Sequence, residues 1–217
     1  MLTSLIHFFY YTFMIIFPIT NPVGMSPIFL SLTKDYDAKQ RRKIAKRVAV
    51  NSFFIYLGAL LFGSWILSFF ALSIPIVKVA GGIMIFFAAF NMLSGKPIIS
   101  TQDENEASAD VDSHDISFFP LTMPITAGAG SLAMAITIGS DIIAVRSFGL
   151  YTITSFCGAA IGIAVLSLTI FICYYFADRI FAKLGKLGTQ VVSQLAAFIL
   201  LAISINIIWQ GIRQLIS

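Results

Sequence analysis

Two short segments of this chain combine proline, glycine and small hydroxyl side chains within stretches that are otherwise apolar. Residues 18–24 read PITNPVG and residues 124–130 read PITAGAG, so proline, isoleucine, threonine and the final glycine recur at matching positions. Proline removes a backbone donor, and glycine lets the chain leave helical geometry. The pattern predicts two broken helices whose free backbone groups could bind a small polar solute.

The candidate binding residues lie in and just after these two breaks. The helices expected to follow Gly24 and Gly130 would present partly positive N-termini, which suit a carboxylate. The threonines and Asn21 could bind an ammonium group or a cation. Asn91 and Asn206 form a further pair at similar depths of two other apolar stretches, with interhelical packing as the alternative reading. The candidates at the breaks are Thr20, Asn21, Gly24, Ser26, Thr126, Gly128, Gly130 and Ser131.

Composition places these breaks in a membrane protein. Hydrophobic residues make up 58% of the 217 residues and charged residues only 11%, whereas a soluble domain carries about 25% charged residues. At about 20 apolar residues per transmembrane helix, this length allows about six spans. The apolar stretches that define them are 5–32, 48–72, 74–93, 118–138, 148–176 and 191–212.

The repeated motif divides the chain into two similar halves. We expect a first three-helix repeat at 1–96, an acidic cytoplasmic linker at 97–117 and a second three-helix repeat at 118–217. Because each repeat has an odd number of spans, the second would enter the membrane in the opposite sense. The predicted fold is therefore an all-α membrane protein with a 3+3 inverted-topology repeat, in which helices one and four are broken.

Basic residues predict the orientation in the membrane. Most of the 14 lysines and arginines lie in the segments 33–47 and 177–190, which we expect to be loops on the same face. Cytoplasmic loops carry such an excess, so both segments are predicted to be cytoplasmic and the termini periplasmic. The net charge of +4 follows this pattern and does not indicate a nucleic-acid-binding face.

The remaining side chains argue against an enzyme. Cys157 and Cys173 share one apolar stretch, whereas a thiol–disulfide carrier of this architecture needs one cysteine in each broken helix. His7 and His114 are isolated, and no Asp or Glu lies in the middle of a span, so neither a metal site nor a buried proton relay is visible. We expect no cofactor, and a coupling ion, H⁺ or Na⁺, would have to use backbone carbonyls, neutral side chains or an edge group.

The two breaks also carry a family resemblance. Residues 21–33 (NPVGMSPIFLSLT) resemble the first conserved block of the MarC family of bacterial inner-membrane proteins, and residues 119–131 (FPLTMPITAGAGS) resemble its second block; the pair Gly81–Gly82 also fits. The first block of the family often has Asp where Asn21 stands, and the second often has Pro where Ala129 stands. The resemblance implies six helices and transport of neutral amino acids, while neutral Asn21 argues against proton coupling at that position.

The sequence thus predicts a secondary transporter in the inner membrane. Its expected substrate is a small neutral amino acid such as alanine, glycine or serine, moved by alternating access between the two halves. Two alternatives stay open at this point: an efflux carrier for another small metabolite, and a membrane assembly subunit that transports nothing. Its expected partners are the substrate and the lipid bilayer, with no nucleic acid, and the sequence does not indicate an oligomeric state.

Overall fold

The computed structural model describes residues 2–94, 113–144 and 149–216, and the regular secondary structure in these ranges is entirely helical. Several helices are much longer than the core of a bilayer requires, and three are short. In chain order they are α1 (Leu2–Thr20), α2 (Pro22–Leu32), α3 (Ala38–Phe69), α4 (Ile74–Leu93), α6 (Ser113–Phe118), the π-helix η1 (Leu121–Thr126), α7 (Ala129–Ala144), α8 (Leu150–Tyr175) and α9 (Ala177–Ile216).

The described helices provide five candidate membrane spans, or six when one bent pair is counted as a single span. The five are α1, α3, α4, α8 and the part of α9 from Leu187 to Ile216. The bent pair joins Ile116–Thr126 to α7 at an angle of 71°. The chain is therefore an integral, multi-pass helical membrane protein, and the predicted fourth span is the one that bends.

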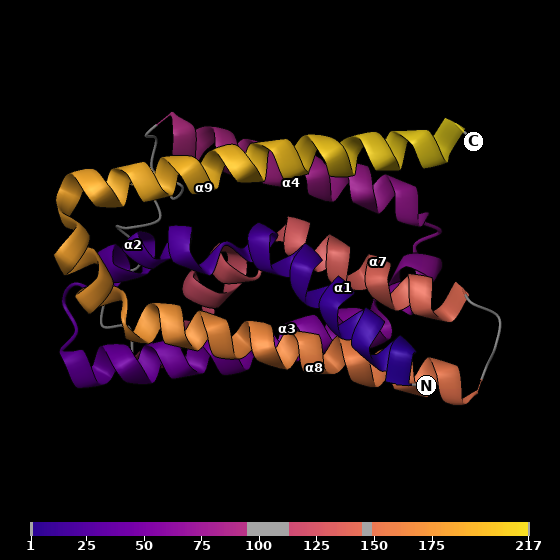
Figure 1. Ribbon diagram of the computed structural model, residues 1–217, viewed down its shortest axis with the longest axis horizontal. Coiled ribbons are helices and arrows are strands. Elements are labelled where there is room, and N and C mark those ends of the chain that lie inside the picture. Colours follow the sequence, from indigo (N-terminus) through magenta and orange to yellow (C-terminus); the bar gives the residue numbers. More distant parts are fainter. Residues whose placement is uncertain (1, 95–112, 145–148, 217) are drawn as a thin grey trace.

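The helices form three layers around the two breaks (Figure 1). Helices α4 and α9 pack along each other in one layer, and α3 and α8 lie together at the opposite side. Between these layers lie α1, α2 and α7, with α1 packed on α8 and α7 packed on both α3 and α4. The path from α1 into α2 runs opposite to the path from η1 into α7, and the first and last helices bring their free ends to one end of the molecule.

Close backbone contact between layers depends on glycine. A Cβ atom at Gly139 of α7 would lie 2.0 Å from the carbonyl oxygen of Leu60 in α3. A Cβ at Gly158 of α8 would lie 2.3 Å from the carbonyl oxygen of Leu5 in α1. Small residues let membrane helices approach in this way, where lipid supplies no hydrophobic force between them.

Two segments that we expected to be loops are largely helical. Residues 33–47 contain the start of α3, because Asp37 and Gln40 form a reciprocal capping box: Gln40 N–H donates to Asp37 Oδ1 at 2.6 Å, and Asp37 N–H donates to Gln40 Oε1 at 3.0 Å. Residues 177–190 lie inside α9, which is interrupted at Gly185, where φ is +64°. The predicted linker 97–117 lies largely outside the described residues, and its last residues belong to α6.

Candidate functional site

The first break lies between α1 and α2 and is organised by Asn21. This residue adopts the left-handed conformation (φ 46°, ψ 55°), which asparagine tolerates better than most side chains, and its side-chain oxygen accepts a hydrogen bond from Gly24 N–H at 3.1 Å. A Cβ at Gly24 would lie 2.3 Å from Asn21 Nδ2, so the cap requires glycine there. Ser26 donates to the carbonyl of Pro22 at 2.7 Å. The second half-helix starts at Pro22, before Gly24, which corrects the expected start.

The second break lies between η1 and α7. Thr126, the last residue of η1, donates its hydroxyl proton to the carbonyl of Leu121 at 2.7 Å. Ser131, in the first turn of α7, donates to the carbonyl of Gly128 at 2.9 Å. Helix α7 starts at Ala129, earlier than the start expected after Gly130, so Gly130 lies inside its first turn. Both breaks thus satisfy part of their backbone with small hydroxyl side chains.

Tyr56 of α3 joins the two breaks. Its hydroxyl oxygen lies 2.9 Å from Thr20 Oγ1 at the end of α1, and it can donate to the carbonyl of Thr126 or to Ser131 Oγ, each at 3.0 Å. Tyr56 is 0% exposed, and Thr20, Thr126 and Ser131 are at most 2% exposed. One phenolic hydroxyl therefore holds together two broken helices that lie far apart in the sequence.

A second buried tyrosine reaches the same place from α8. Tyr174 Oη lies 2.9 Å from Thr126 Oγ1. Because the Thr126 hydroxyl proton points to the Leu121 carbonyl, Tyr174 is the donor in this bond. The Tyr174 ring stacks on Phe29 of α2, with centroids 4.5 Å apart. We call the set Thr20, Tyr56, Thr126, Ser131 and Tyr174 the break cluster.

Sequence reasoning missed both tyrosines, although a signal was present. Membrane proteins concentrate tyrosine at the two interfaces, where its hydroxyl reaches water. Tyr56 instead falls well inside the apolar stretch 48–72, so its hydroxyl needed a partner in the protein interior. Tyr174 lies near the end of its apolar stretch and reads as an ordinary interfacial residue.

The other predicted residues take different places. Gly130 packs against α4, because a Cβ there would lie 2.1 Å from Ile85 Cγ1 and 3.0 Å from the carbonyl oxygen of Gly81. Asn91 is half-buried on α4, and Asn206 is exposed on α9, where its side-chain oxygen accepts a hydrogen bond from Gln210 at 3.3 Å. Within the described residues neither asparagine is hydrogen-bonded to the break cluster, whereas Asn21 adjoins it through Thr20.

The break cluster is built from neutral groups. Its described members contribute hydroxyl groups, and Asn21 adds an amide whose Nδ2 is a buried donor without a hydrogen-bond partner in the described part of the chain. Lys78, near the start of α4, is a buried basic residue of the described chain, and its ammonium group donates to Gln214 Oε1 at 3.2 Å. No group of three His, Cys, Asp or Glu side chains among residues 2–94, 113–144 and 149–216 is placed to hold a metal ion.

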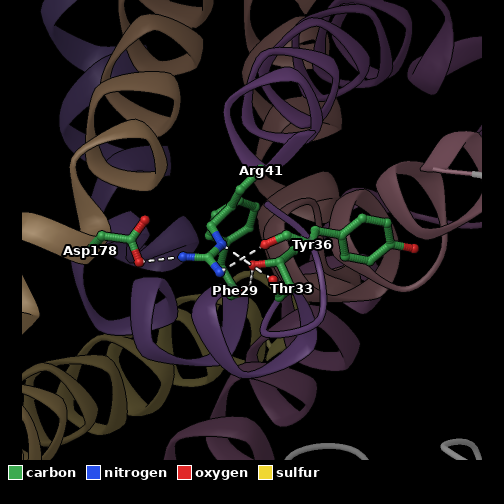
Figure 2. Close-up of polar contacts among 5 residues, drawn as sticks. All are labelled: Phe29, Thr33, Tyr36, Arg41 and Asp178. Carbon is green, nitrogen blue, oxygen red and sulfur yellow. Dashed lines mark hydrogen bonds and ion pairs between the residues drawn. The ribbon is translucent and has the colours of Figure 1, made fainter. Parts of the chain in front are cut away.

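A separate group of polar contacts connects the segment between α2 and α3 with the start of α9 (Figure 2). The guanidinium of Arg41 donates to the carbonyls of Thr33 and Tyr36, each at 3.2 Å, and forms an ion pair with Asp178 at the start of α9. Thr33 in turn donates to the carbonyl of Phe29 at 2.7 Å. Since Phe29 stacks on Tyr174, these contacts lead from the ion pair to the break cluster.

Comparison with known proteins agrees with this architecture. The family described as MarC family integral membrane protein matches residues 6–216. The UPF0056 membrane protein YvbG of Bacillus subtilis is 34% identical over 207 residues, covering 95% of this chain and 94% of that protein. The UPF0056 membrane protein MJ1677 of Methanocaldococcus jannaschii is 32% identical, covering 96% and 97%. No solved structure matches the chain. The similarity extends over nearly the whole length, and the chain belongs to the MarC family of integral membrane proteins.

Proposed function

We propose that this protein is a secondary transporter of small neutral amino acids, of the alanine, glycine and serine class, and that the two breaks form its binding site. The observation that supports this most is the hydroxyl of Tyr56, which binds groups from both broken spans. Broken helices at equivalent places of two halves are where secondary transporters bind their substrates. A plain structural kink needs no such connection between the two breaks.

The chemistry of the site fits a zwitterion. The first turn of α7 provides backbone N–H groups at the positive end of a helix, and Asn21 Nδ2 adds an unpartnered buried donor, so both suit a carboxylate. The hydroxyls of Thr20 and Thr126 and the carbonyl of Thr126, which now accepts from Tyr56, suit the ammonium group. A substrate with a charged side chain would need a counter-charge, which the described break cluster lacks, since burying an unpaired charge is costly.

The substrate must also be small, and the site must open. Thr20, Asn21, Tyr56, Thr126 and Ser131 are all at most 9% exposed. We therefore take the observed conformation as an occluded one, in which a substrate would replace some of the hydrogen bonds of Tyr56. Opening toward one side or the other would require the two broken spans to separate around this residue.

The proposal includes an orientation. The basic segments 33–47 and 177–190 would face the cytoplasm across a bacterial inner membrane, and the two termini would face the periplasm. The opposite directions of the α1–α2 and η1–α7 paths support a 3+3 inverted repeat. A coupling ion, H⁺ or Na⁺, would bind hydroxyl and carbonyl oxygens, because no carboxylate faces the described break cluster.

Counterflow in proteoliposomes tests the proposal. Vesicles containing purified protein are preloaded with unlabelled alanine, glycine or serine, and uptake of the labelled amino acid is followed. The proposal predicts transient accumulation that is lost in Thr126→Val, which removes the hydroxyl at nearly constant volume. The matched control is Thr137→Val, because Thr137 is also buried but, among the described residues, its hydroxyl bonds only to the Ala133 carbonyl of its own helix, at 2.8 Å.

Three results separate the possible outcomes. Counterflow that survives in Thr137→Val and disappears in Thr126→Val, at equal amounts of folded protein, supports both the activity and the site. Equal activity of the two variants would mean that substrate binds elsewhere. Folded protein that exchanges no small neutral amino acid would contradict the proposal and favour export of another metabolite or a subunit that needs a partner.

A further inference from the structure

A groove runs along the membrane-facing side of α3 and α8. It has a volume of about 540 Å³ and is lined by successive turns of the two helices, which lie side by side (Figure 1). Its lining is mainly apolar and includes buried Ala49 and Ser167, exposed Ala164 and partly exposed phenylalanines. The lining residues that the argument uses are Lys46, Ala49, Phe53, Ala164, Ser167 and Phe171.

The two helices run in opposite directions, and one contact fixes their register. The Arg42 guanidinium lies over the Tyr175 ring, 4.8 Å from its centroid. One turn along from this contact, toward the middle of both helices, Lys46 and Phe171 line the groove. Phe53 and Ala164 line its far end. At 1.5 Å per residue the distance along α3 from Lys46 to Phe53 is about 11 Å. This is comparable with one leaflet of hydrocarbon, which is about 15 Å thick.

Ser167 is an unusual member of the lining. It is only 6% exposed, yet its hydroxyl has no hydrogen-bond partner in the described residues. Other hydroxyls of α8 are satisfied by their own helix: Ser155 donates to the Tyr151 carbonyl and Thr169 to the Val165 carbonyl, each at 2.8 Å. Burial without a hydrogen bond is unfavourable, so this hydroxyl would gain from an acceptor brought to it by a molecule in the groove.

We propose that this groove binds an anionic phospholipid. The phosphate would lie at the ammonium group of Lys46, near the exposed Arg42 and Lys43, where three positive charges gather at the end of α3. One acyl chain would fill the apolar groove toward Phe53. Ser167 lies about one turn deeper than Lys46, in the direction in which the glycerol esters follow the phosphate, and would donate to an ester carbonyl.

Each part of the groove corresponds to one part of this lipid. A second protein chain could cover the apolar walls, but it would not account for a cation at one end and a buried hydroxyl one turn below. A zwitterionic lipid would fill the groove equally well but would gain less from Lys46. The charge at the end of the groove therefore selects an anionic headgroup, and each basic residue near the surface contributes about fivefold in affinity.

Native mass spectrometry of the purified protein tests the proposal. The protein is titrated with phosphatidylglycerol and, separately, with phosphatidylcholine of the same acyl chains, and retained lipid is counted. We expect preferential retention of phosphatidylglycerol, reduced about fivefold in Lys46→Gln. Lys39→Gln is the matched control, since Lys39 is exposed on the same helix end but does not line the groove. Ala164→Phe, which fills the groove from its exposed side, should reduce retention of both lipids.

The outcomes distinguish a specific site from its alternatives. Equal loss in Lys46→Gln and Lys39→Gln would show general attraction to a basic surface and would overturn the proposal. Unchanged lipid retention in Ala164→Phe would do the same. A dimer that dissociates in Ala164→Phe, with no change in bound lipid, would assign the groove to a second copy of the chain instead.

Discussion

The removal of one oxygen atom, in Tyr56→Phe, is the sharpest perturbation that the structure suggests. The ring remains and no cavity forms, so the change isolates the hydrogen bonds of the hydroxyl. Ser131 keeps its bond to the Gly128 carbonyl, whereas Thr20 and the Thr126 carbonyl lose their contact with the tyrosine. Interhelical hydrogen bonds in membrane proteins contribute about 0.6 kcal/mol on average and about 1.7 at most. Two such bonds predict a loss of about 1–2 kcal/mol in the free energy of unfolding.

Unfolding in mixed micelles by increasing the fraction of a denaturing detergent measures this loss. Tyr151→Phe is the control, because Tyr151 lies near the start of α8 and is 39% exposed. Tyr174→Phe should cost less than Tyr56→Phe, since it removes a single bond to Thr126. Because both tyrosines contact Thr126, the double variant should deviate from additivity by about 0.5 kcal/mol or more. A cost of Tyr56→Phe no larger than that of Tyr151→Phe would refute the view that Tyr56 joins the breaks.

Three further changes test separate parts of the structure in the same unfolding assay. Asn21→Ala should cost about 1–3 kcal/mol, because it loses the cap and places alanine at a left-handed position, whereas Asn21→Gly should cost only a few tenths; similar costs would disprove the cap. Gly139→Ala should cost about 1–3 kcal/mol through its clash with Leu60, while Gly58→Ala, which meets nothing within 4 Å, should be near neutral; equal effects would disprove the close approach. Asp178→Asn should cost less than about 1 kcal/mol, because the carboxylate is half-exposed; a larger cost would mean that its ion pair has a major structural role.

Much of the fold was predictable because the bilayer simplifies the problem. Apolar stretches of sufficient length must be helices that satisfy their own backbone. The predicted third span, 74–93, coincides with α4, and the breaks expected in spans one and four occur near Asn21 and after Thr126. Hydropathy misjudged the segments 33–47 and 177–190, because a polar, basic sequence can continue a helix beyond the membrane. The capping box at Asp37 was the local signal that the charge pattern obscured.

The candidate site was predictable only in part. The repeated motif located Thr20, Thr126 and Ser131, which the structure places around one tyrosine. Tyr56 itself could not be assigned from a single sequence, because its role depends on how α3 packs against two breaks that are distant along the chain. Gly130 illustrates the opposite difficulty. Its place in a motif suggested substrate contact, but the absence of a side chain there allows close packing against α4.

Accessibility of the second break tests the central claim most directly. A single cysteine is placed at Ser131, in a chain whose Cys157 and Cys173 are replaced by alanine, and reconstituted protein is exposed to a small water-soluble thiol reagent from either side. If the breaks form an alternating-access site, Ser131→Cys is labelled slowly from both sides, and the amino acid that supports counterflow protects it. Labelling from neither side, or labelling that this amino acid does not change, would contradict a substrate site between the two broken spans.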